Sequence, residues 1–154
     1  MGQTSQMAAK VPVAALVAAV TLAACGPSRD PVERLLHGLS SAAEGRDAAA
    51  VGERLAEDFR GENGMTKAEA VATVRQYLAG YDHVGVQLFD VQRPGAARVT
   101  FRVDFTGKPK EIGGLAGLLP SAAVYEFELE LVGEGSDLKV ARAAWRPWSP
   151  PASP

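Results

Sequence analysis

Between residues 30 and 80, apolar residues recur at helical spacing. Asp30, Pro31 and Glu33 have the order of an N-cap, a first and a third helical residue, which predicts a helix from Asp30 to about Ala43. Gly45 is expected to end this helix. Its apolar residues form one stripe: Val32, Leu35, Leu36 and Leu39.

Two further helices are predicted before residue 80. Asp47 is expected to begin the second, and its apolar residues recur at every fourth position: Val51, Leu55 and Phe59. The sequence "RGENG" then forms a loop, and Thr66 with Glu69 makes a capping box for the third helix. Gly80 closes it. The apolar stripe of this helix consists of Ala70, Val71, Val74 and Leu78.

After Asp82 the period changes to two, which predicts strands. "HVGVQLFDV" alternates weakly, "RPG" is a turn signal, and "AARVTFRVDFTG" and "VYEFELEL" alternate cleanly. The inward positions of the two clear strands are Ala97, Val99, Phe101, Val103 and Phe105, then Tyr125, Phe127, Leu129 and Leu131. If these strands are neighbours, Arg98 and Arg102 can meet the outward Glu126, Glu128 and Glu130, at about 0 to 1 kcal/mol for each exposed pair.

The end of the chain predicts one more strand, from Leu138 to Trp145. Its apolar residues change from even-numbered positions (Leu138, Val140) to odd-numbered ones (Ala143, Trp145), which indicates either a bulge near Arg142 or a strand covered on both faces. The proline-rich tail "RPWSPPASP" is expected to be unpacked. The apolar connection at residues 108–121 is long for a hairpin, and it could complete the core, cover a pocket, dock on a partner or touch the membrane.

Three helices followed by four antiparallel strands with one apolar face predict an α+β domain, in which a curved sheet wraps a helix layer. The order of "LAEDFRGENGMTKAEAVATVRQYL", the alternating strands and the closing "LKVARAAW" resembles the nuclear transport factor 2-like superfamily, which includes SnoaL-like proteins. This resemblance implies a cone-shaped, cystatin-like fold with a pocket between sheet and helices. Such pockets serve catalysis, ligand binding or protein association, so the fold does not choose among them.

The N-terminal 24 residues have the pattern of a secretory signal. Lys10 gives a positive start, and residues 11–24 form an apolar run that is shorter than the roughly 20 residues a membrane-spanning helix needs. The order Leu22, Ala23, Ala24, Cys25 resembles the bacterial lipobox, in which an enzyme lipidates the cysteine and a peptidase cuts before it. We therefore expect cleavage between Ala24 and Cys25 and lipid attachment at Cys25.

This resemblance implies a membrane anchor. Several acyl chains anchor a protein stably, because each buried CH₂ contributes about 0.8 kcal/mol. Gly26 stands where an aspartate usually marks retention in the inner membrane, so we expect the periplasmic face of the outer membrane, with the inner membrane as the alternative. The expected organisation is a signal peptide at 1–24, a tether at 25–29, a domain at 30–148 and a tail at 149–154.

Charge and residue types narrow the possible chemistry. Residues 25–154 contain 15 basic and 18 acidic residues, a formal charge of −3, so no basic surface for nucleic acid is expected. Cys25 has no partner for a disulfide or a catalytic pair. The two histidines, His37 and His83, have no metal-ligand spacing, so we expect no metal and no cofactor, and His37 lies off the apolar stripe as a solvated residue.

Acid–base catalysis needs a carboxylate or histidine facing the pocket, and the inward strand positions carry none. The remaining polar candidates are Tyr77, Tyr81, Asp82, His83 and Asp90. We therefore expect a non-catalytic module that binds a small hydrophobic ligand or an envelope protein. An isomerase or dehydratase using Asp82 or His83, and a dimeric scaffold, are the alternatives. The expected ligand-binding residues are Phe101, Phe105, Tyr125, Phe127 and Trp145.

Overall fold

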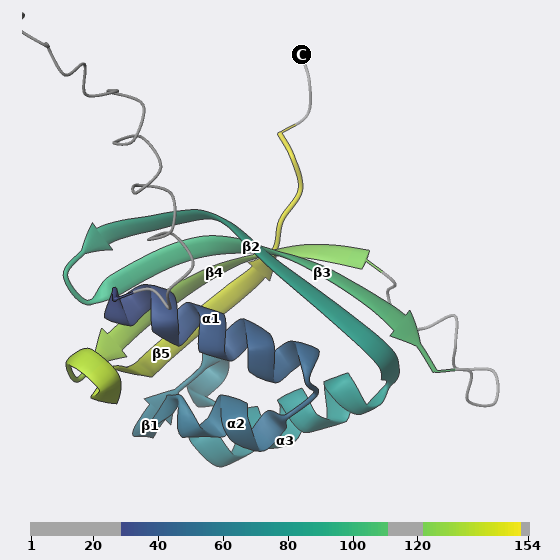
Figure 1. The fold of residues 1–154 in the computed structure, drawn as a ribbon, viewed down its shortest axis with the longest axis horizontal. Coiled ribbons are helices and arrows are strands. Elements are labelled where there is room, and N and C mark those ends of the chain that lie inside the picture. Colours follow the sequence, from purple (N-terminus) through teal and green to yellow (C-terminus); the bar gives the residue numbers. More distant parts are fainter. Residues whose placement is uncertain (1–28, 111–121, 152–154) are drawn as a thin grey trace, which may run out of the picture.

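The computed structural model describes residues 29–110 and 122–151. Within them a curved five-stranded sheet packs its concave face against three helices, so the predicted α+β architecture is confirmed (Figure 1). The elements in chain order are α1 (Pro31–Glu44), α2 (Ala48–Glu53), β1 (Leu55–Arg60), η2 (Glu62–Gly64), α3 (Lys67–Ala79), β2 (Tyr81–Gly95), β3 (Arg98–Pro109), β4 (Ala122–Val132), η3 (Gly135–Asp137) and β5 (Lys139–Pro147).

The predicted caps of α1 and α3 are confirmed. The Asp30 carboxylate accepts hydrogen bonds from the backbone N–H groups of Val32 (2.8 Å) and Glu33 (3.2 Å), so it satisfies donors that the first turn leaves open. At α3, Thr66 and Glu69 bond reciprocally, each side chain accepting from the other's backbone N–H. These local signals fix where both helices begin.

The second predicted helix is wrong in its last part. α2 begins after its N-cap Asp47 as expected, but it ends at Glu53. Leu55 and Phe59 belong to β1, where Leu55 pairs in parallel with Val140 of β5. Residues four apart share one side of a helix and also one face of a strand, so the spacing alone does not separate the two. The strand prevails because it buries both side chains against the sheet.

The strands form one sheet in the order β1-β5-β4-β3-β2, antiparallel except for the β1–β5 pair. The inward positions of β3 are buried from Val99 to Phe105 as predicted, whereas Ala97 lies exposed in the turn before it. That turn lies at residues 96–97 instead of at "RPG", because β2 continues through this tripeptide and Gly95 pairs with Arg98.

The outward face carries the expected ion pairs. Two rows cross three strands, since Arg98 and Arg142 flank Glu130, and Arg102 and Arg146 flank Glu126. Arg98 also lies 3.4 Å from a carboxylate oxygen of Glu128. The remaining distances in the rows are 3.4 Å for Arg98–Glu130, 3.5 Å for Arg142–Glu130 and 3.8 Å for Arg102–Glu126, with Arg146 bonded to Glu126.

β5 contains the predicted bulge. Glu130 pairs with Arg142 and the next residue, Leu131, pairs with Val140, so Ala141 is the extra residue. The expectation of an unpacked tail is wrong for its first three residues. Arg146 and Pro147 extend β5, and Trp148 follows. The backbone N–H of Trp148 donates to Val124 (2.9 Å), and the Arg102 guanidinium lies 4.5 Å from the centre of the indole ring.

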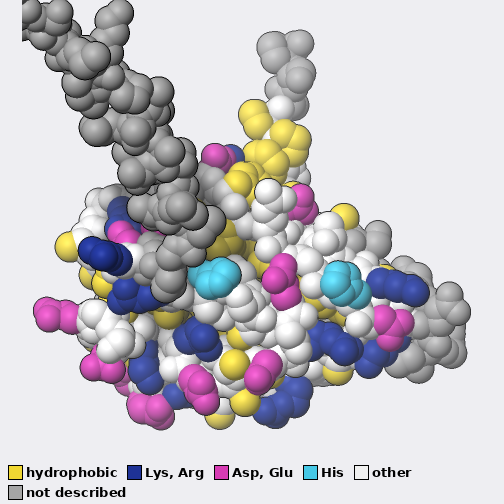
Figure 2. Space-filling view, viewed as in Figure 1, with side chains coloured by type: hydrophobic (Ala, Val, Ile, Leu, Met, Phe, Trp, Pro, Cys, Tyr) yellow, Lys and Arg dark blue, Asp and Glu magenta, His cyan; other side chains and the backbone are white. Residues whose placement is uncertain are grey.

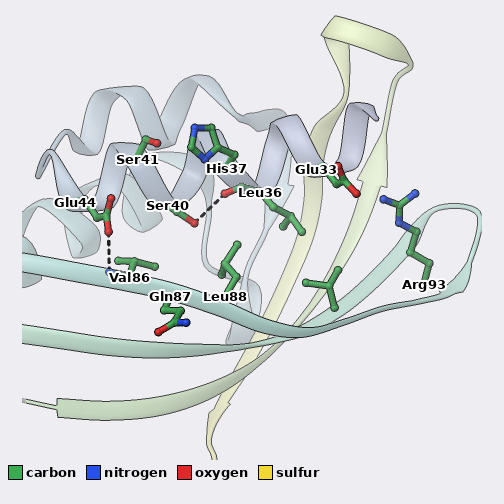
Figure 3. A pocket seen from close by; sticks show the side chains of 11 residues that line it. Glu33, Leu36, His37, Ser40, Ser41, Glu44, Val86, Gln87, Leu88 and Arg93 are labelled. Carbon is green, nitrogen blue, oxygen red and sulfur yellow. Dashed lines mark hydrogen bonds between the residues drawn. The ribbon is translucent and has the colours of Figure 1, made fainter. Parts of the chain in front are cut away.

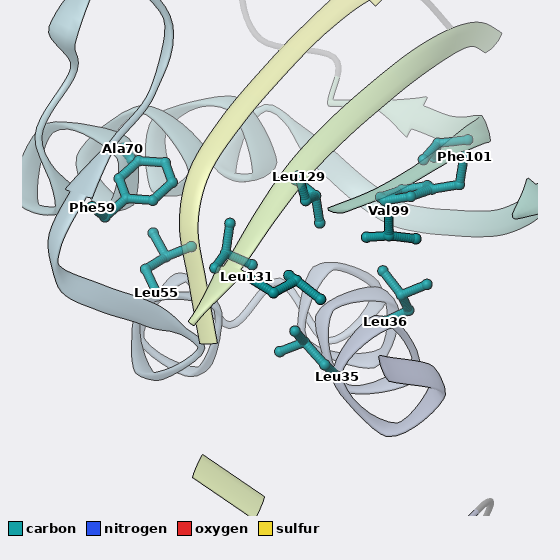
Figure 4. Packing of buried hydrophobic residues seen from close by; sticks show 11 residues of the cluster. Leu35, Leu36, Leu55, Phe59, Ala70, Val99, Phe101, Leu129 and Leu131 are labelled. Atoms are coloured by element: carbon teal, nitrogen blue, oxygen red, sulfur yellow. The ribbon is translucent and has the colours of Figure 1, made fainter. Parts of the chain in front are cut away.

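The core fills the space between the helices and the concave face of the sheet (Figure 4). Its larger cluster joins α1, β1, α3 and the sheet through Leu35, Leu36, Leu55, Phe59, Ala70, Val99, Phe101, Val103, Leu129, Leu131 and Val140. A smaller cluster at the start of β2 consists of Leu78, Tyr81, Val84 and Phe105. Burial of these side chains is the main stabilising contribution to the fold.

Several predictions lie outside the described residues. These are the signal peptide at 1–24, the lipid site at Cys25 and residues 111–121 of the long connection. Of that connection, Lys108 and Pro109 belong to β3, and the backbone N–H of Lys110 donates to Gly80 (2.8 Å). In residues 29–110 and 122–151, no helix is long and apolar enough to cross a membrane.

Candidate functional site

A groove lies between α1 and β2, with a cavity volume of about 520 Å³ (Figure 3). Leu36 points into it from α1 and Leu88 from β2, and Val86 and Val91 extend this apolar floor. The side of α1 that faces the groove follows helical spacing: Glu33, Leu36, His37, Ser40, Ser41 and Glu44. The groove therefore runs along most of α1, and we call it the α1–β2 groove.

Two polar contacts close the ends of the α1–β2 groove. At the N-terminal end of α1, Arg93 of β2 lies 2.7 Å from the Asp30 carboxylate. This hydrogen bond lowers the pKa of Asp30 below its usual value and raises that of Arg93. At the other end, the Glu44 carboxylate accepts from the backbone N–H of Val86 (3.1 Å). The helix is therefore held to the strand at both ends, with the cavity between these contacts.

The rim of the α1–β2 groove is polar, and its floor is apolar. His37 is exposed at this rim, as expected for a solvated residue. Ser40 donates its hydroxyl hydrogen to the Leu36 carbonyl (3.0 Å). The arrangement provides an apolar contact surface between charged ends, which is the composition of a binding site.

A second cavity of about 270 Å³ lies between the first turn of α1 and the η3 region. Its arginines have structural partners. Arg34 donates to the Arg29 carbonyl (2.6 Å), and Arg54 donates to the Ala50 carbonyl (2.6 Å). The Arg54 side chain also lies directly over Gly38, where a Cβ atom would be only 2.3 Å from its Nε. The arginines of this cavity therefore bond to nearby carbonyls, and Arg54 also packs against α1 at Gly38.

The five predicted ligand-binding residues lie on the concave face but line neither cavity. Three of them form a stacked row across β3, β4 and β5. The ring centres of Phe101 and Phe127 are 5.5 Å apart, and those of Phe127 and Trp145 are 6.2 Å apart. Phe105 is buried in the smaller core cluster, and Tyr125 packs against it. Their role in ligand binding stays a prediction.

The acid–base candidates are not brought together in a pocket. Asp82 and His83 are both exposed and line neither cavity, so they do not form a catalytic pair shielded from water. Asp90 is exposed, bonds to Arg102 and has a φ of 52°, at a bulge where β2 shifts register against β3.

Tyr77 of α3 and Tyr81, the first residue of β2, pack together at the start of that strand. Tyr81 is completely buried, and its hydroxyl donates to that of Tyr77 (3.3 Å). Burial, together with the hydrogen bond to Tyr81, raises the pKa of the Tyr77 phenol far above its usual value. The Tyr77 phenol therefore stays protonated, and it packs against the smaller core cluster, to which Tyr81 belongs.

Charge and metal-binding groups add no further site to the described part of the chain. No group of three or more His, Cys, Asp and Glu side chains among these residues could hold a metal ion. On the face seen in Figure 2, basic and acidic side chains are interspersed, with no continuous basic patch.

The α1–β2 groove was missed by the sequence reasoning. A signal for it exists, since Glu33, His37, Ser40, Ser41 and Glu44 form a polar stripe beside the leucine stripe of α1. A polar stripe ordinarily indicates a solvated helix face. Its second wall comes from β2, whose alternation is weak, so the sequence did not reveal that strand and helix run side by side.

Comparisons with known proteins agree on the fold. No protein-family model matches the sequence. No curated protein sequence matches it either.

Among solved structures, a proposed scytalone dehydratase from Novosphingobium aromaticivorans superposes with a TM-score of 0.61 at 12% identity, covering 77% of this chain and 83% of that one. A cystatin-fold protein from the same organism gives 0.57 at 16%, with coverages of 73% and 94%. A nuclear transport factor 2-like protein from Cytophaga hutchinsonii gives 0.53 at 10%, with 79% and 94%. The chain therefore has the nuclear transport factor 2-like, cystatin-like α+β fold, and the likeness concerns the fold alone.

Proposed function

We propose that this protein is a lipid-anchored, non-catalytic module of the bacterial cell envelope that binds a protein partner through the α1–β2 groove. The observation that carries the proposal is the groove itself, which has a volume of about 520 Å³, an apolar floor whose Val91 is 45% exposed, and charged ends. An open groove accepts a segment of a larger partner, whereas a small ligand is usually enclosed over most of its surface.

The chemistry of the described residues favours binding over catalysis. All of their buried side chains are apolar or aromatic, and the acid–base candidates Asp82 and His83 are exposed. A general acid or base with a tuned pKa needs burial or a charged neighbour inside a pocket. Although one structural neighbour is described as a proposed scytalone dehydratase, at 12% identity it shares only the fold.

The lipid anchor would place the groove close to the membrane. Arg29, the first described residue, follows Cys25 by four residues, which span at most about 14 Å. α1 begins directly after this tether, and the Asp30 end of the groove lies at its first turn. The preferred location is the periplasmic face of the outer membrane, because Gly26 follows the cysteine.

Photo-crosslinking in the envelope of the native host tests the groove. A benzophenone side chain replaces Val91, which is 45% exposed in the groove, and Val132, 50% exposed at the end of β4, is the matched control. We expect a discrete protein adduct from position 91 only, lost when Ser40→Phe fills the groove. Equal labelling from both positions, or adducts unaffected by Ser40→Phe, would contradict the proposal.

The anchor is tested separately. Cys25→Ser is expected to release the protein from the membrane fraction or to leave an uncleaved precursor. The intact mass of the wild-type protein should show the added acyl groups. Membrane-bound, acylated Cys25→Ser protein would contradict lipid attachment at this residue.

A small hydrophobic ligand is the second candidate, favoured by the stacked row of Phe101, Phe127 and Trp145, the last two of which are only half-buried. Native mass spectrometry of the full chain, released from detergent, would reveal it as a reproducible added mass that Trp145→Ala abolishes. A purely structural role as a homodimer is the third, and the same spectra would report the mass of the assembly.

A further inference from the structure

β2 is an edge strand that faces the α1–β2 groove. It lies at the end of the sheet order and pairs only with β3. The backbone N–H of Val86 points away from β3, since it donates to the Glu44 side chain. The register with β3 is continuous from His83 to Phe89, so Leu88 directs its own N–H and C=O to the same side. This edge therefore presents backbone groups that another strand could pair with.

The helix beside this edge supplies a second wall. The polar stripe of α1 from Glu33 to Glu44 covers about 16 Å along the helix axis, which corresponds to about five residues of extended chain. One face of an added strand would contact Leu36 and the apolar floor. A groove between an edge strand and a helix is a known geometry for binding extended peptides, in which backbone bonds give affinity.

The charges of the groove select the occupant. Its charged lining residues are the carboxylates of Glu33 and Glu44 and the guanidinium of Arg93, which is bonded to Asp30 outside the lining, so that with His37 neutral the lining has a formal charge of −1. Arg46, the next cation after Glu44 along the chain, donates to the Tyr81 carbonyl (2.8 Å) and does not line the groove. The groove is therefore net acidic, and a basic segment complements it.

We infer that the α1–β2 groove binds an extended, basic segment of the partner protein by strand addition to the β2 edge. The segment pairs with the outward backbone groups of Val86 and Leu88, and its basic side chains approach Glu33 and Glu44. In the structure of the single chain, the Glu44 carboxylate accepts the Val86 hydrogen bond that a carbonyl of the incoming strand would accept. This inference rests on the proposed function and specifies its binding mode.

Synthetic peptides test the mode on the full chain in detergent micelles. The probe is a dye-labelled heptapeptide, Lys-Thr-Val-Thr-Val-Thr-Lys, called the Lys–Val peptide, in which the Val residues and the two terminal Lys residues share one face of an extended strand. One control is the same peptide N-methylated at every residue, which keeps side chains and charge but has no backbone donors. The second control, the Glu–Val peptide, has Glu in place of both Lys residues. Fluorescence anisotropy gives the dissociation constants, and hydrogen exchange with mass spectrometry reports protection along β2.

We expect the Lys–Val peptide to bind at least tenfold more tightly than either control and to slow amide exchange in residues 84–89, the stretch of β2 before its register shift. Leu88→Pro should abolish this difference, because it removes an outward N–H without removing a bond to β3. If that variant fails to fold, the N-methylated peptide still tests the same bond on the unchanged protein.

Equal binding of the methylated peptide overturns strand addition, and equal binding of the Glu–Val peptide overturns the basic specificity. Either result with a groove-specific crosslink at position 91 leaves the proposed function standing. If the Lys–Val peptide shows no preferential binding and position 91 gives no groove-specific crosslink, the proposed function is contradicted as well.

Discussion

The two edges of the sheet differ in how their backbone groups are satisfied. At one edge, β1 covers the first half of β5, the Glu62 carboxylate accepts from the Trp145 N–H (3.1 Å), and Pro147 has no N–H to offer. At the other edge, β2 runs for 15 residues. Of its backbone groups that point away from β3, the Val86 N–H donates to the Glu44 carboxylate. The comparison indicates that β5 is closed to other strands and that the edge of β2 is available.

This difference follows from which elements lie beside each edge. β1 is held against β5 by buried side chains, of which Phe59 is 2% exposed. α1 is packed on the sheet through the buried Leu35 and Leu36, whereas its polar contacts to β2 lie at its two ends, at Asp30 and Glu44. Edge strands are usually protected against pairing, so an edge that lies open beside an apolar groove supports the proposed binding surface.

The largest expected effect comes from removing the cover of the closed edge. Phe59→Ala deletes a buried ring between β1 and α3 and should lower the free energy of unfolding by about 3 to 5 kcal/mol. Val91→Ala, at the open edge and 45% exposed, should change it by less than about 0.5 kcal/mol. Urea denaturation measures both. Similar losses for the two variants would contradict the assignment of closed and open edges.

A medium effect is expected from opening the closed edge without changing the core. Glu62→Ala removes the acceptor for the Trp145 N–H and should cost about 0.5 to 1.5 kcal/mol. Combined with Pro147→Val, it creates a free edge and should raise the mass measured by sedimentation above that of the parent. Glu62→Ala with Pro150→Val, which lies beyond β5, is the matched control. An unchanged mass in the first double variant would show that these two residues do not close the edge.

The open edge should respond to acid through Asp30. The hydrogen bond from Arg93 lowers its pKa in the folded protein below the usual 3.8, so its contribution to stability is complete above the unfolded pKa and is lost as pH falls through the folded pKa. Lys67 and Thr66 lower the pKa values of Glu57 and Glu69 in the same direction.

Asp30→Asn keeps an acceptor for the helix cap but loses the charge. It should therefore flatten the dependence of unfolding free energy on pH in the acid range below about pH 5. Denaturation at a series of pH values measures this slope. An unaltered slope would mean that Arg93 does not couple α1 to β2 electrostatically.

The smallest effect is expected on the outward face of the sheet, away from both edges. Glu126→Ala breaks the row of Arg102, Glu126 and Arg146, and should cost less than about 1 kcal/mol because these side chains are partly or largely exposed. A loss as large as that of Phe59→Ala would show that the ion-pair rows, rather than the core, hold the three strands together.

The sequence predicted the elements whose signals are local. The caps at Asp30 and Thr66 located two helices, and the alternation of β3 and β4 assigned their inward and outward residues correctly. β1 was missed because its partner, Val140, is far away in the sequence and the spacing of Leu55 and Phe59 fits two structures. The groove was missed for a related reason, since its two walls belong to α1 and β2, and only the folded chain brings them side by side.

The bulge at Asp90 limits the length of strand that can pair with the edge of β2. Before the bulge, even-numbered residues such as Val86 and Leu88 direct their backbone N–H and C=O groups away from β3. After the register shift, the even-numbered residues no longer do so. A straight incoming strand can thus match only the short stretch before the bulge. Fibril-forming contacts use uninterrupted segments of six or seven residues. The edge can therefore accept one short strand without offering a template for continued growth.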